Sequence, residues 1–147
     1  YAGYLASAEV RSASEKKFER FCETCDAVDW VYKNGDKGAE YFSIVYMDSF
    51  GKQKSFFPDY IISVRGEIWI IETKGGFDRT GKSEDIDIFS PRKFEVLKNY
   101  LEKYGLHGGF VREDKQSQEL CICMDMYNED IKGEYWALLD NVMEVAL

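Results

Sequence analysis

Histidine occurs once among the 147 residues of this sequence, as His107. A single histidine excludes a metal site built from two histidines of this chain and argues against a histidine-based catalytic triad. His107 stands between Gly105 and the pair Gly108 and Gly109, which predicts a loop residue with a structural role or plain exposure.

Long hydrophobic runs are missing too. No stretch approaches the ~20 apolar residues that a membrane-spanning helix requires, so we expect no membrane partner. Residues 1–4 lack the basic region and the apolar stretch that begin a signal peptide. The first residue is Tyr1 rather than methionine, and we expect the chain to be a piece of a longer protein.

Positive charge is in the minority. The chain has 19 lysines and arginines against 27 aspartates and glutamates, for a formal net charge of −8. A protein that binds nucleic acid alone is usually basic, so this balance argues against such a role for the isolated chain. It leaves room for a local basic rim, or for a larger protein in which another domain makes most phosphate contacts.

Cysteine is limited to Cys22 and Cys25 in a CxxC pattern and to Cys121 and Cys123 in a CxC pattern. One interpretation is a four-thiolate zinc site. The interpretation we favour is that the first pair lies on an amphipathic helix and the second in an apolar strand, all four as reduced, packed thiols. The absence of a disulfide framework indicates a cytoplasmic location.

The sequence does contain enough apolar material for one packed domain, with 45% hydrophobic and 16% aromatic residues. We expect a loose or partly helical lead-in segment over residues 1–11 and a single domain over residues 12–147. Helices are predicted at 13–26, where Ser12 and Glu15 have capping-box spacing, and from Ser90 as N-cap to about residue 105.

Strand patterns and turn signals fill the rest of the domain. The predicted strands are 28–32, 41–47, 53–64, 67–74, 110–112 and 120–126, and residues 135–145 are expected to form a short helix or a mixture of strand and helix. This order predicts an α/β fold with a mixed β-sheet flanked by helices.

The central hairpin is the most informative part of the chain. Arg65 and Gly66 separate two apolar runs and predict a two-residue turn. The same register carries Asp59 opposite Glu72, where two carboxylates ~5 Å apart repel by about 3 kcal/mol at an effective dielectric of about 20. Both faces of the hairpin are apolar, so we expect both to be covered.

Such a pair of acids indicates a metal site. Asp59 and Glu72 offer hard oxygen ligands of the kind that Mg²⁺ or Mn²⁺ prefers, and the backbone carbonyl of Thr73 can add a third. Lys74 projects from the same strand face as Glu72 and can orient a metal-activated water. The alternative is a turn residue at Asp59 and a solvated strand end at Glu72 and Lys74.

Pro58-Asp59, twelve further residues and then Glu72-Thr73-Lys74 resemble the PD-(D/E)XK nuclease signature. Two more stretches, together with the residues around the signature, narrow the resemblance to the C-terminal endonuclease domain of the Res subunit of type III restriction enzymes. The resemblance covers about residues 12–104 and extends more weakly to the end of the chain. The four stretches are residues 14–18, 30–35, 57–62 and 69–75.

The resemblance implies a restriction-endonuclease-like fold and Mg²⁺-dependent cleavage of double-stranded DNA. It implies that Asp59 and Glu72 hold the metal and that Lys74 positions the water. In the family, a methyltransferase (Mod) subunit recognises the DNA site and an upstream helicase domain consumes ATP. This sequence has no GxxxxGK[ST] phosphate loop, so neither ATP dependence nor site specificity is assigned to its residues.

Weaker candidates surround this set. Glu15 matches an acidic position that approaches the metal or orients a water in the family, and it serves equally well as a capping-box glutamate. Lys93 is more simply a solvated charge than a phosphate contact, and Asp85 and Asp87 are more simply loop residues than supporting acids. The glycine-rich loop is equally a phosphate contact, through Arg79 and Lys82, or a plain connector.

A different class of function is also compatible with these residues. A non-catalytic domain can keep a nuclease-like scaffold for protein docking or for holding DNA. The net charge of −8 favours this alternative, and the intact set of two acids and a lysine favours the enzyme.

Overall fold

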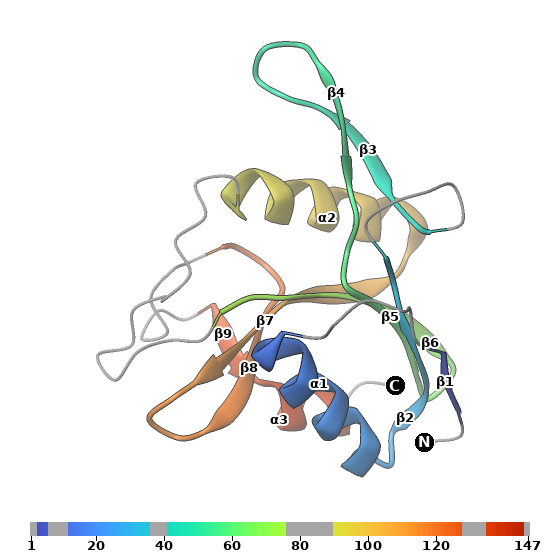
Figure 1. The fold of residues 1–147 in the computed structure, drawn as a ribbon, viewed down its shortest axis with the longest axis vertical. Helices are drawn as coiled ribbons and strands as arrows, with labels where there is room; N and C mark the ends of the chain where they lie inside the picture. The colour runs from blue at the N-terminus through green and yellow to red at the C-terminus, as the bar shows by residue number, and fades with distance from the viewer. Residues whose placement is uncertain (1–2, 6–11, 36–40, 76–89, 128–134, 146–147) are drawn as a thin grey trace.

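The computed structural model describes residues 3–5, 12–35, 41–75, 90–127 and 135–145. Their elements, coloured along the chain in Figure 1, alternate strands with three helices. In chain order they are β1 (Gly3–Leu5), α1 (Ala13–Thr24), β2 (Val28–Lys33), β3 (Ile44–Met47), β4 (Gln53–Phe56), β5 (Tyr60–Val64), β6 (Glu67–Thr73), α2 (Ser90–Tyr104), β7 (His107–Asp114), β8 (Glu119–Cys123), β9 (Trp136–Leu138) and α3 (Leu139–Val145).

A mixed seven-stranded sheet forms the centre of the molecule, in the order β1-β2-β5-β6-β7-β8-β9. The pairs β1–β2 and β6–β7 are parallel and the others antiparallel. A parallel pair needs a crossover connection, and α2 lies in the crossover between β6 and β7. The expected α/β class, with a mixed central sheet and flanking helices, is confirmed.

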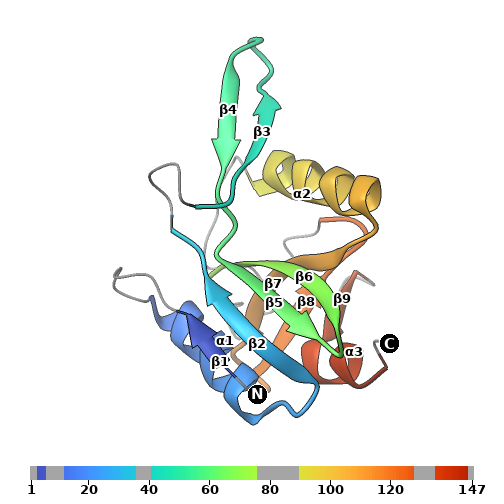
Figure 2. The same ribbon diagram turned by 90° about the vertical axis from the view of Figure 1, so that its right-hand side faces the viewer.

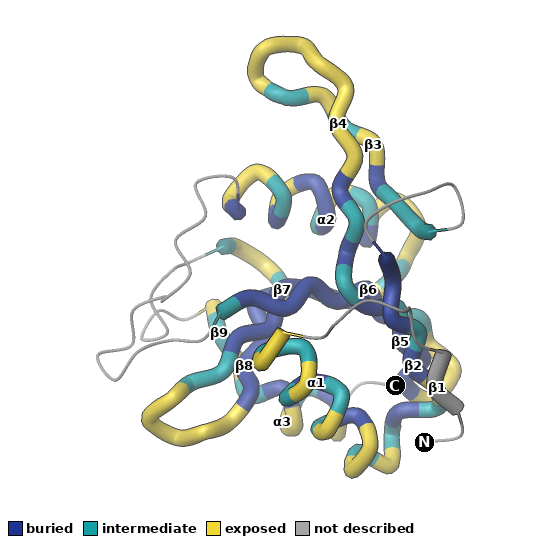
Figure 3. Tube along the Cα trace, viewed as in Figure 1, coloured by how far each residue is buried: buried dark blue, intermediate teal, exposed yellow. Residues whose placement is uncertain are grey.

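Helices cover both faces of this sheet, α1 and α3 on one and α2 on the other (Figures 1 and 2). Tyr60, Ile62 and Ile71 belong to the core beneath α1 and α3, whereas Ile70 and Phe110 belong to the core beneath α2. Burial is therefore deepest in the middle strands (Figure 3). The hairpin is apolar on both faces because each face packs against a different helical layer.

Local capping signals agree with the observed helix ends. Ser12 and Glu15 form the predicted capping box at α1, which ends at Thr24 with Cys25 as its C-cap, slightly before the predicted end. Gly105, at φ +65°, ends α2 as expected. The predicted cap at Ser90 is wrong: this residue starts the helix, and its buried hydroxyl has no hydrogen-bond partner within the described ranges.

Three other expectations are corrected. Within the lead-in segment, residues 3–5 form a strand that extends the sheet beside β2. His107 begins β7 rather than lying in a loop, and its exposed ring stacks on Trp69 at 5.3 Å between centroids. Residues 53–64 are two strands, because Pro58 lacks the N–H that a continuous ladder needs.

The break at Pro58 separates a second, two-stranded sheet, in which β3 pairs only with β4. This hairpin, residues 44–56, is called the β3–β4 arm below. It projects away from the seven-stranded sheet beyond α2 in both views (Figures 1 and 2). The strand predicted over 41–47 corresponds to its first strand, Ile44–Met47.

The four cysteines are free thiols, and their positions rule out the zinc alternative. Cys22 lies on the buried side of α1, and Cys123 belongs to the core beneath α2, on the opposite face of the sheet. Across the part of the chain that the structure describes, no group of three or more histidine, cysteine, aspartate or glutamate side chains is arranged to hold a metal ion. The described helices are also too short or too polar to cross a membrane.

Candidate metal and catalytic site

The register of the central hairpin is the one that the sequence predicts. Val64 pairs with Glu67 across the turn, and the last pair of the ladder is Tyr60 with Ile71. Arg65 and Gly66 have φ values of 49° and 81°, the positive values that a tight type I′ turn requires. The next residues along the two strands are Asp59 and Glu72, so the turn brings both acids to the far end of the hairpin.

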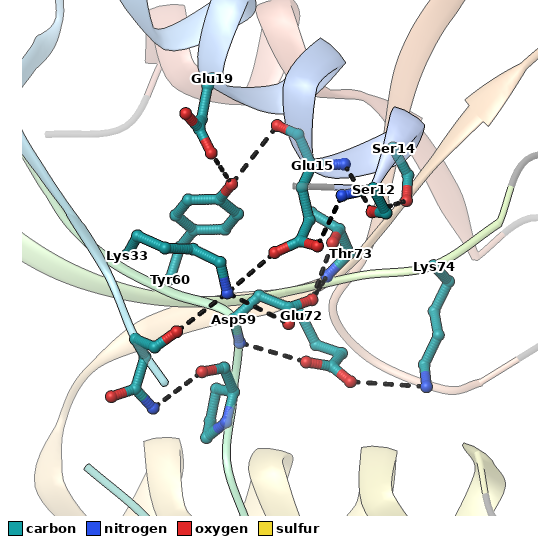
Figure 4. Close-up of polar contacts among 12 residues, drawn as sticks. Ser12, Ser14, Glu15, Glu19, Lys33, Asp59, Tyr60, Glu72, Thr73 and Lys74 are labelled. Atoms are coloured by element: carbon teal, nitrogen blue, oxygen red, sulfur yellow. Dashed lines mark hydrogen bonds and ion pairs between the residues drawn. The ribbon is translucent and has the colours of Figure 1, made fainter. Parts of the chain in front are cut away.

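Hydrogen bonds join the two acids into one cluster (Figure 4). The Asp59 backbone N–H donates to Glu72 Oε1 at 3.2 Å. Asp59 Oδ2 accepts hydrogen bonds from the Thr73 backbone N–H at 2.9 Å and from the Thr73 hydroxyl at 2.7 Å. The predicted meeting of Asp59, Glu72 and Thr73 is thus observed, with Asp59 held just outside the ladder.

Lys74 lies beside Glu72, as its position two residues along the strand predicts. Its Nζ is 3.4 Å from Glu72 Oε2 and 5.3 Å from the centre of the Phe110 ring. Its backbone N–H donates to the Val111 carbonyl at 2.9 Å. Parallel pairing with β7 therefore fixes the main chain of Lys74, and the buried side chain turns toward the acids.

A second lysine enters the cluster from β2. It lies within the stretch 30–35, but no site role was predicted for it from the sequence. Lys33 is only 4% exposed, and its Nζ lies 2.8 Å from Glu15 Oε2 and 3.8 Å from Asp59 Oδ1. The available signal was strand alternation: Lys33 is two residues from the buried Val31 and so shares its inward face. A lysine at an inward strand position needs an acidic partner.

Glu15 forms the predicted capping box and also lies at the edge of the cluster, where its role toward a metal or a water stays a prediction. Its Oε1 accepts a hydrogen bond from the Ser12 N–H at 3.1 Å, which caps α1. Its other carboxylate oxygen pairs with Lys33 at the edge of the cluster. The hydroxyl of the buried Tyr60 donates to the Glu15 carbonyl at 3.4 Å and also bonds Glu19, which ties α1 to the start of β5.

The electrostatics of the two central acids are unfavourable. Burial raises the pKa of Glu72 well above its usual range, and the charge of Asp59 raises it further. The positive charges of Lys74 and Lys93 only partly oppose this rise in the Glu72 pKa. Burial also raises the pKa of Asp59, against the hydrogen bonds from Thr73. Two carboxyl groups that resist ionisation together are suited to bind a compensating cation.

Glu15 shows the opposite behaviour. Burial by itself would raise the pKa of its carboxyl group, but the hydrogen bond and charge of Lys33 and the bond to Ser12 outweigh burial, and the pKa lies below its usual value. Lys33 therefore serves as an internal counter-ion that keeps Glu15 charged. The folded state gains stability from this pair above the ordinary pKa of glutamate, and loses it as pH falls through the lowered pKa.

Replacing Lys33 by methionine is expected to lower the free energy of unfolding by about 3 kcal/mol at neutral pH, because it leaves a mostly buried carboxylate without its partner. The loss should shrink in acid, where Glu15 is protonated in both proteins. Urea unfolding of both proteins at a series of pH values measures the difference in their free energies of unfolding. Lys16→Met, at an exposed position on α1, is the control. A deficit that stayed constant down to acid pH would contradict the role of Lys33.

The donor set fits a hard divalent cation. Asp59 and Glu72 supply two carboxylates, which matches Mg²⁺, an ion that keeps several waters and uses one or two protein carboxylates. In an extended strand the N–H and C=O of one residue point to the same side. The Thr73 N–H reaches Asp59, so the Thr73 carbonyl lies on that side as well.

Two residues for which no site role was predicted from the sequence hold the ends of β5 and β6, the strands that carry the cluster. Arg112, fully buried on β7, donates to the Gly75 carbonyl at 2.7 Å and so fixes the main chain just after Lys74. Asn34, also buried, donates its backbone N–H to the Asp59 carbonyl at 2.8 Å. Neither has a local sequence signal, because the partner of each is distant in the chain.

Of the weaker site candidates named from the sequence, besides Glu15, the structure describes only Lys93. Lys93, on the first turn of α2, is half-buried, and its positive charge acts to lower the pKa of Glu72; both interpretations of this lysine stay predictions. Asp85, Asp87, Arg79 and Lys82 lie outside the described residues.

These features define a mixed α/β protein with two acids and a lysine gathered at one end of its central hairpin. No protein-family model, curated protein or solved structure matches the chain.

Proposed function

We propose that this chain is a restriction-endonuclease-like nuclease domain that hydrolyses phosphodiester bonds of double-stranded DNA with Mg²⁺ or Mn²⁺. The observation that carries the proposal is the convergence of Asp59, Glu72 and Lys74 at one end of a tight hairpin. The resemblance to the endonuclease domain of type III restriction enzymes, carried by the same residues, supports DNA as the substrate.

Each residue has a defined part in the proposed reaction. Asp59, Glu72 and the Thr73 carbonyl hold the ion, which when bound polarises the scissile phosphate and acidifies a water. The Lys74 ammonium group orients the attacking water and stabilises the charge that develops on the phosphate. Lys33 keeps Glu15 ionised beside Asp59, where that carboxylate can accept a hydrogen bond from water.

The proposal extends to partners and location by the same resemblance. A Mod subunit would recognise the DNA site, and a helicase domain in a longer chain would deliver DNA to the nuclease. The free thiols of the protein suit a reducing compartment, in agreement with a cytoplasmic location.

Cleavage of supercoiled plasmid DNA tests the proposed function. The wild-type protein should nick or linearise plasmid with Mg²⁺ or Mn²⁺ and should leave it intact with EDTA. The alternative is a nuclease-like scaffold that only docks a protein or holds DNA, which the net charge of −8 favours. Intact plasmid after incubation with the longer protein, its Mod subunit, ATP and Mg²⁺ would support that alternative.

Metal binding can be measured separately from cleavage. Mg²⁺ at about tenfold its Kd should stabilise the wild type by about 1.4 kcal/mol and raise Tm by roughly 3–5 °C, because the ion binds only the folded protein. Asp59→Ala should abolish the increase, whereas Glu23→Ala, at an exposed position on α1, should retain it. An equal increase in all three proteins would show that the ion binds elsewhere.

A further inference from the structure

The β3–β4 arm exposes side chains that the proposed catalytic cluster does not use. Its tip residue, Phe50, is 87% exposed, and Val45 and Met47 are more than half exposed. Figure 3 shows the outer part of the arm coloured mostly as exposed. Exposed apolar side chains that gather on one projecting element, rather than singly, indicate a surface that meets a partner.

The pairing within the arm sorts its side chains onto two faces. Tyr46 pairs with Lys54 and Met47 with Gln53, so Tyr46 and Lys54 lie on one face and Met47 on the other. Lys52, two residues before Lys54, shares the face of Lys54. Arg92, at the start of α2, joins the first face: its guanidinium group lies 5.8 Å from the centre of the Tyr46 ring.

Positive charge is concentrated on that first face, although the whole chain carries −8. Lys52, Lys54 and Arg92 line a single hollow, which also includes Asp48 and Phe50. Asp48 Oδ1 already accepts hydrogen bonds from the backbone N–H groups of Phe50 and Lys52, both at 2.9 Å.

The cations of the hollow differ in their partners. Arg92 pairs with Glu95 at 3.1 Å, but Lys52 and Lys54 are exposed and form no ion pair within the described part of the chain. A local excess of lysine on an acidic protein is complementary to a polyanion.

The base of the arm is tied to the candidate site. The strand β4 leads through Pro58 directly to Asp59. The buried Asn34 side chain holds both ends of the arm: its Nδ2 donates to the Phe42 carbonyl at 2.7 Å and to the Pro58 carbonyl at 2.9 Å, and its Oδ1 accepts from the Phe42 N–H at 3.0 Å. The same residue donates its backbone N–H to the Asp59 carbonyl, so Asn34 links the base of the arm to the candidate site.

We propose that the β3–β4 arm is a DNA-binding element that grips the phosphate backbone of a double-stranded substrate beside the catalytic cluster. Lys52, Lys54 and Arg92 contact phosphates, and Phe50 packs against the sugar or base edges of a groove. This inference rests on the proposed function for the choice of DNA as the ligand. It adds the surface that receives the DNA and the residues that hold it, for which charge complementarity is the argument.

The test is fluorescence anisotropy with a labelled duplex of about 30 base pairs, long enough to span both arm and cluster. Measurements use the Lys74→Ala background in EDTA, so that cleavage is not needed. Relative to this parent, Lys52→Glu with Lys54→Glu should weaken binding at least about tenfold and reduce the slope of log K against log salt by about 2. Phe50→Ala should weaken binding with an unchanged slope.

A matched control separates a specific contact from bulk charge. Lys16→Glu with Lys103→Glu makes the same change in net charge at exposed positions on α1 and α2, and should weaken binding no more than about threefold. Circular dichroism and Tm confirm that each variant is folded. The inference is overturned if the parent does not bind the duplex, if the arm variant binds as well as the parent, or if the two charge variants weaken binding equally.

The outcomes also distinguish this inference from the proposed function. Arm-dependent binding, together with intact plasmid after incubation with the longer protein, its Mod subunit, ATP and Mg²⁺, would support the arm and refute the nuclease. Metal-dependent cleavage that is unaffected by Lys52→Glu with Lys54→Glu would support the nuclease and refute the arm. Binding of a protein partner through Val45 and Met47, with no effect of the arm lysines on duplex affinity, would likewise overturn the inference.

Discussion

Lys74→Met is expected to lower the rate of metal-dependent plasmid cleavage by about 10²–10³-fold, the usual effect of removing one group that stabilises transition-state charge. Methionine keeps a side chain of similar length against the Phe110 ring, so the fold should be unchanged. The ligands Asp59 and Glu72 remain, and the Mg²⁺-induced rise in Tm should persist.

The measurement is the initial rate of nicking at saturating Mg²⁺. Lys16→Met is the matched control, since Lys16 is an exposed lysine of α1 away from the cluster. The assignment of Lys74 would be refuted by a variant that cleaves at the wild-type rate. A variant that has also lost the Mg²⁺-induced rise in Tm would place Lys74 in metal binding instead of water positioning.

Glu72→Gln is expected to change stability and activity in opposite directions. Without metal at neutral pH it should raise the free energy of unfolding by about 1–2 kcal/mol, because it removes a buried charge that burial and Asp59 both disfavour. Glutamine can still accept the hydrogen bond from the Asp59 N–H through its side-chain carbonyl. The same change should abolish cleavage and the stabilising effect of Mg²⁺, because a neutral amide is a poor ligand for the ion.

The pH dependence of stability follows from the upward shift of the Glu72 pKa in the folded state. The folded state holds a proton on Glu72 above the pH at which the unfolded chain releases it. The stability of the wild type in EDTA should therefore fall as pH rises above the ordinary pKa of glutamate, until it passes the raised folded pKa. Glu72→Gln should show a smaller decline, because Asp59 still contributes through its own raised pKa, and Glu23→Gln should retain the full decline. Urea unfolding across this pH range measures the effect, and parallel profiles for all three proteins would contradict it.

The proposed metal binding and the stability of the metal-free protein would thus oppose each other in this cluster. The acids that would hold the ion destabilise the protein without it, and the internal cations Lys33 and Lys74 compensate only in part. Active sites commonly accept such a cost in stability.

Short-range chemistry accounts for the parts of the fold that were predictable. The capping box at Ser12 and Glu15 uses residues three apart, and the turn at Arg65 and Gly66 needs only a glycine between apolar runs. Once that turn is known, strand geometry alone places Asp59 near Glu72 and directs Lys74 to the same side. The core of the site was therefore accessible from the sequence.

The features that were not predicted all depend on contacts between residues far apart in the chain. Lys33 reaches Asp59 only because β2 pairs with β5 on the edge opposite β6, and no local pattern specifies that pairing. The charge of Lys93 acts on the pKa of Glu72 because the crossover places α2 over the sheet. The second strand of the β3–β4 arm was predicted as the start of a longer strand over residues 53–64, and only the missing N–H of Pro58 indicated the break.

The sequence alone determined the local geometry of the acid pair, since a two-residue turn and the period of a strand leave a single register. Tertiary structure decided what surrounds that pair: the buried counter-ion from β2, the half-buried lysine from α2 and the cationic arm clamped by Asn34. These depend on contacts between residues far apart in the chain, whose pairing is selected by the packing of two separate cores rather than by any nearby residue.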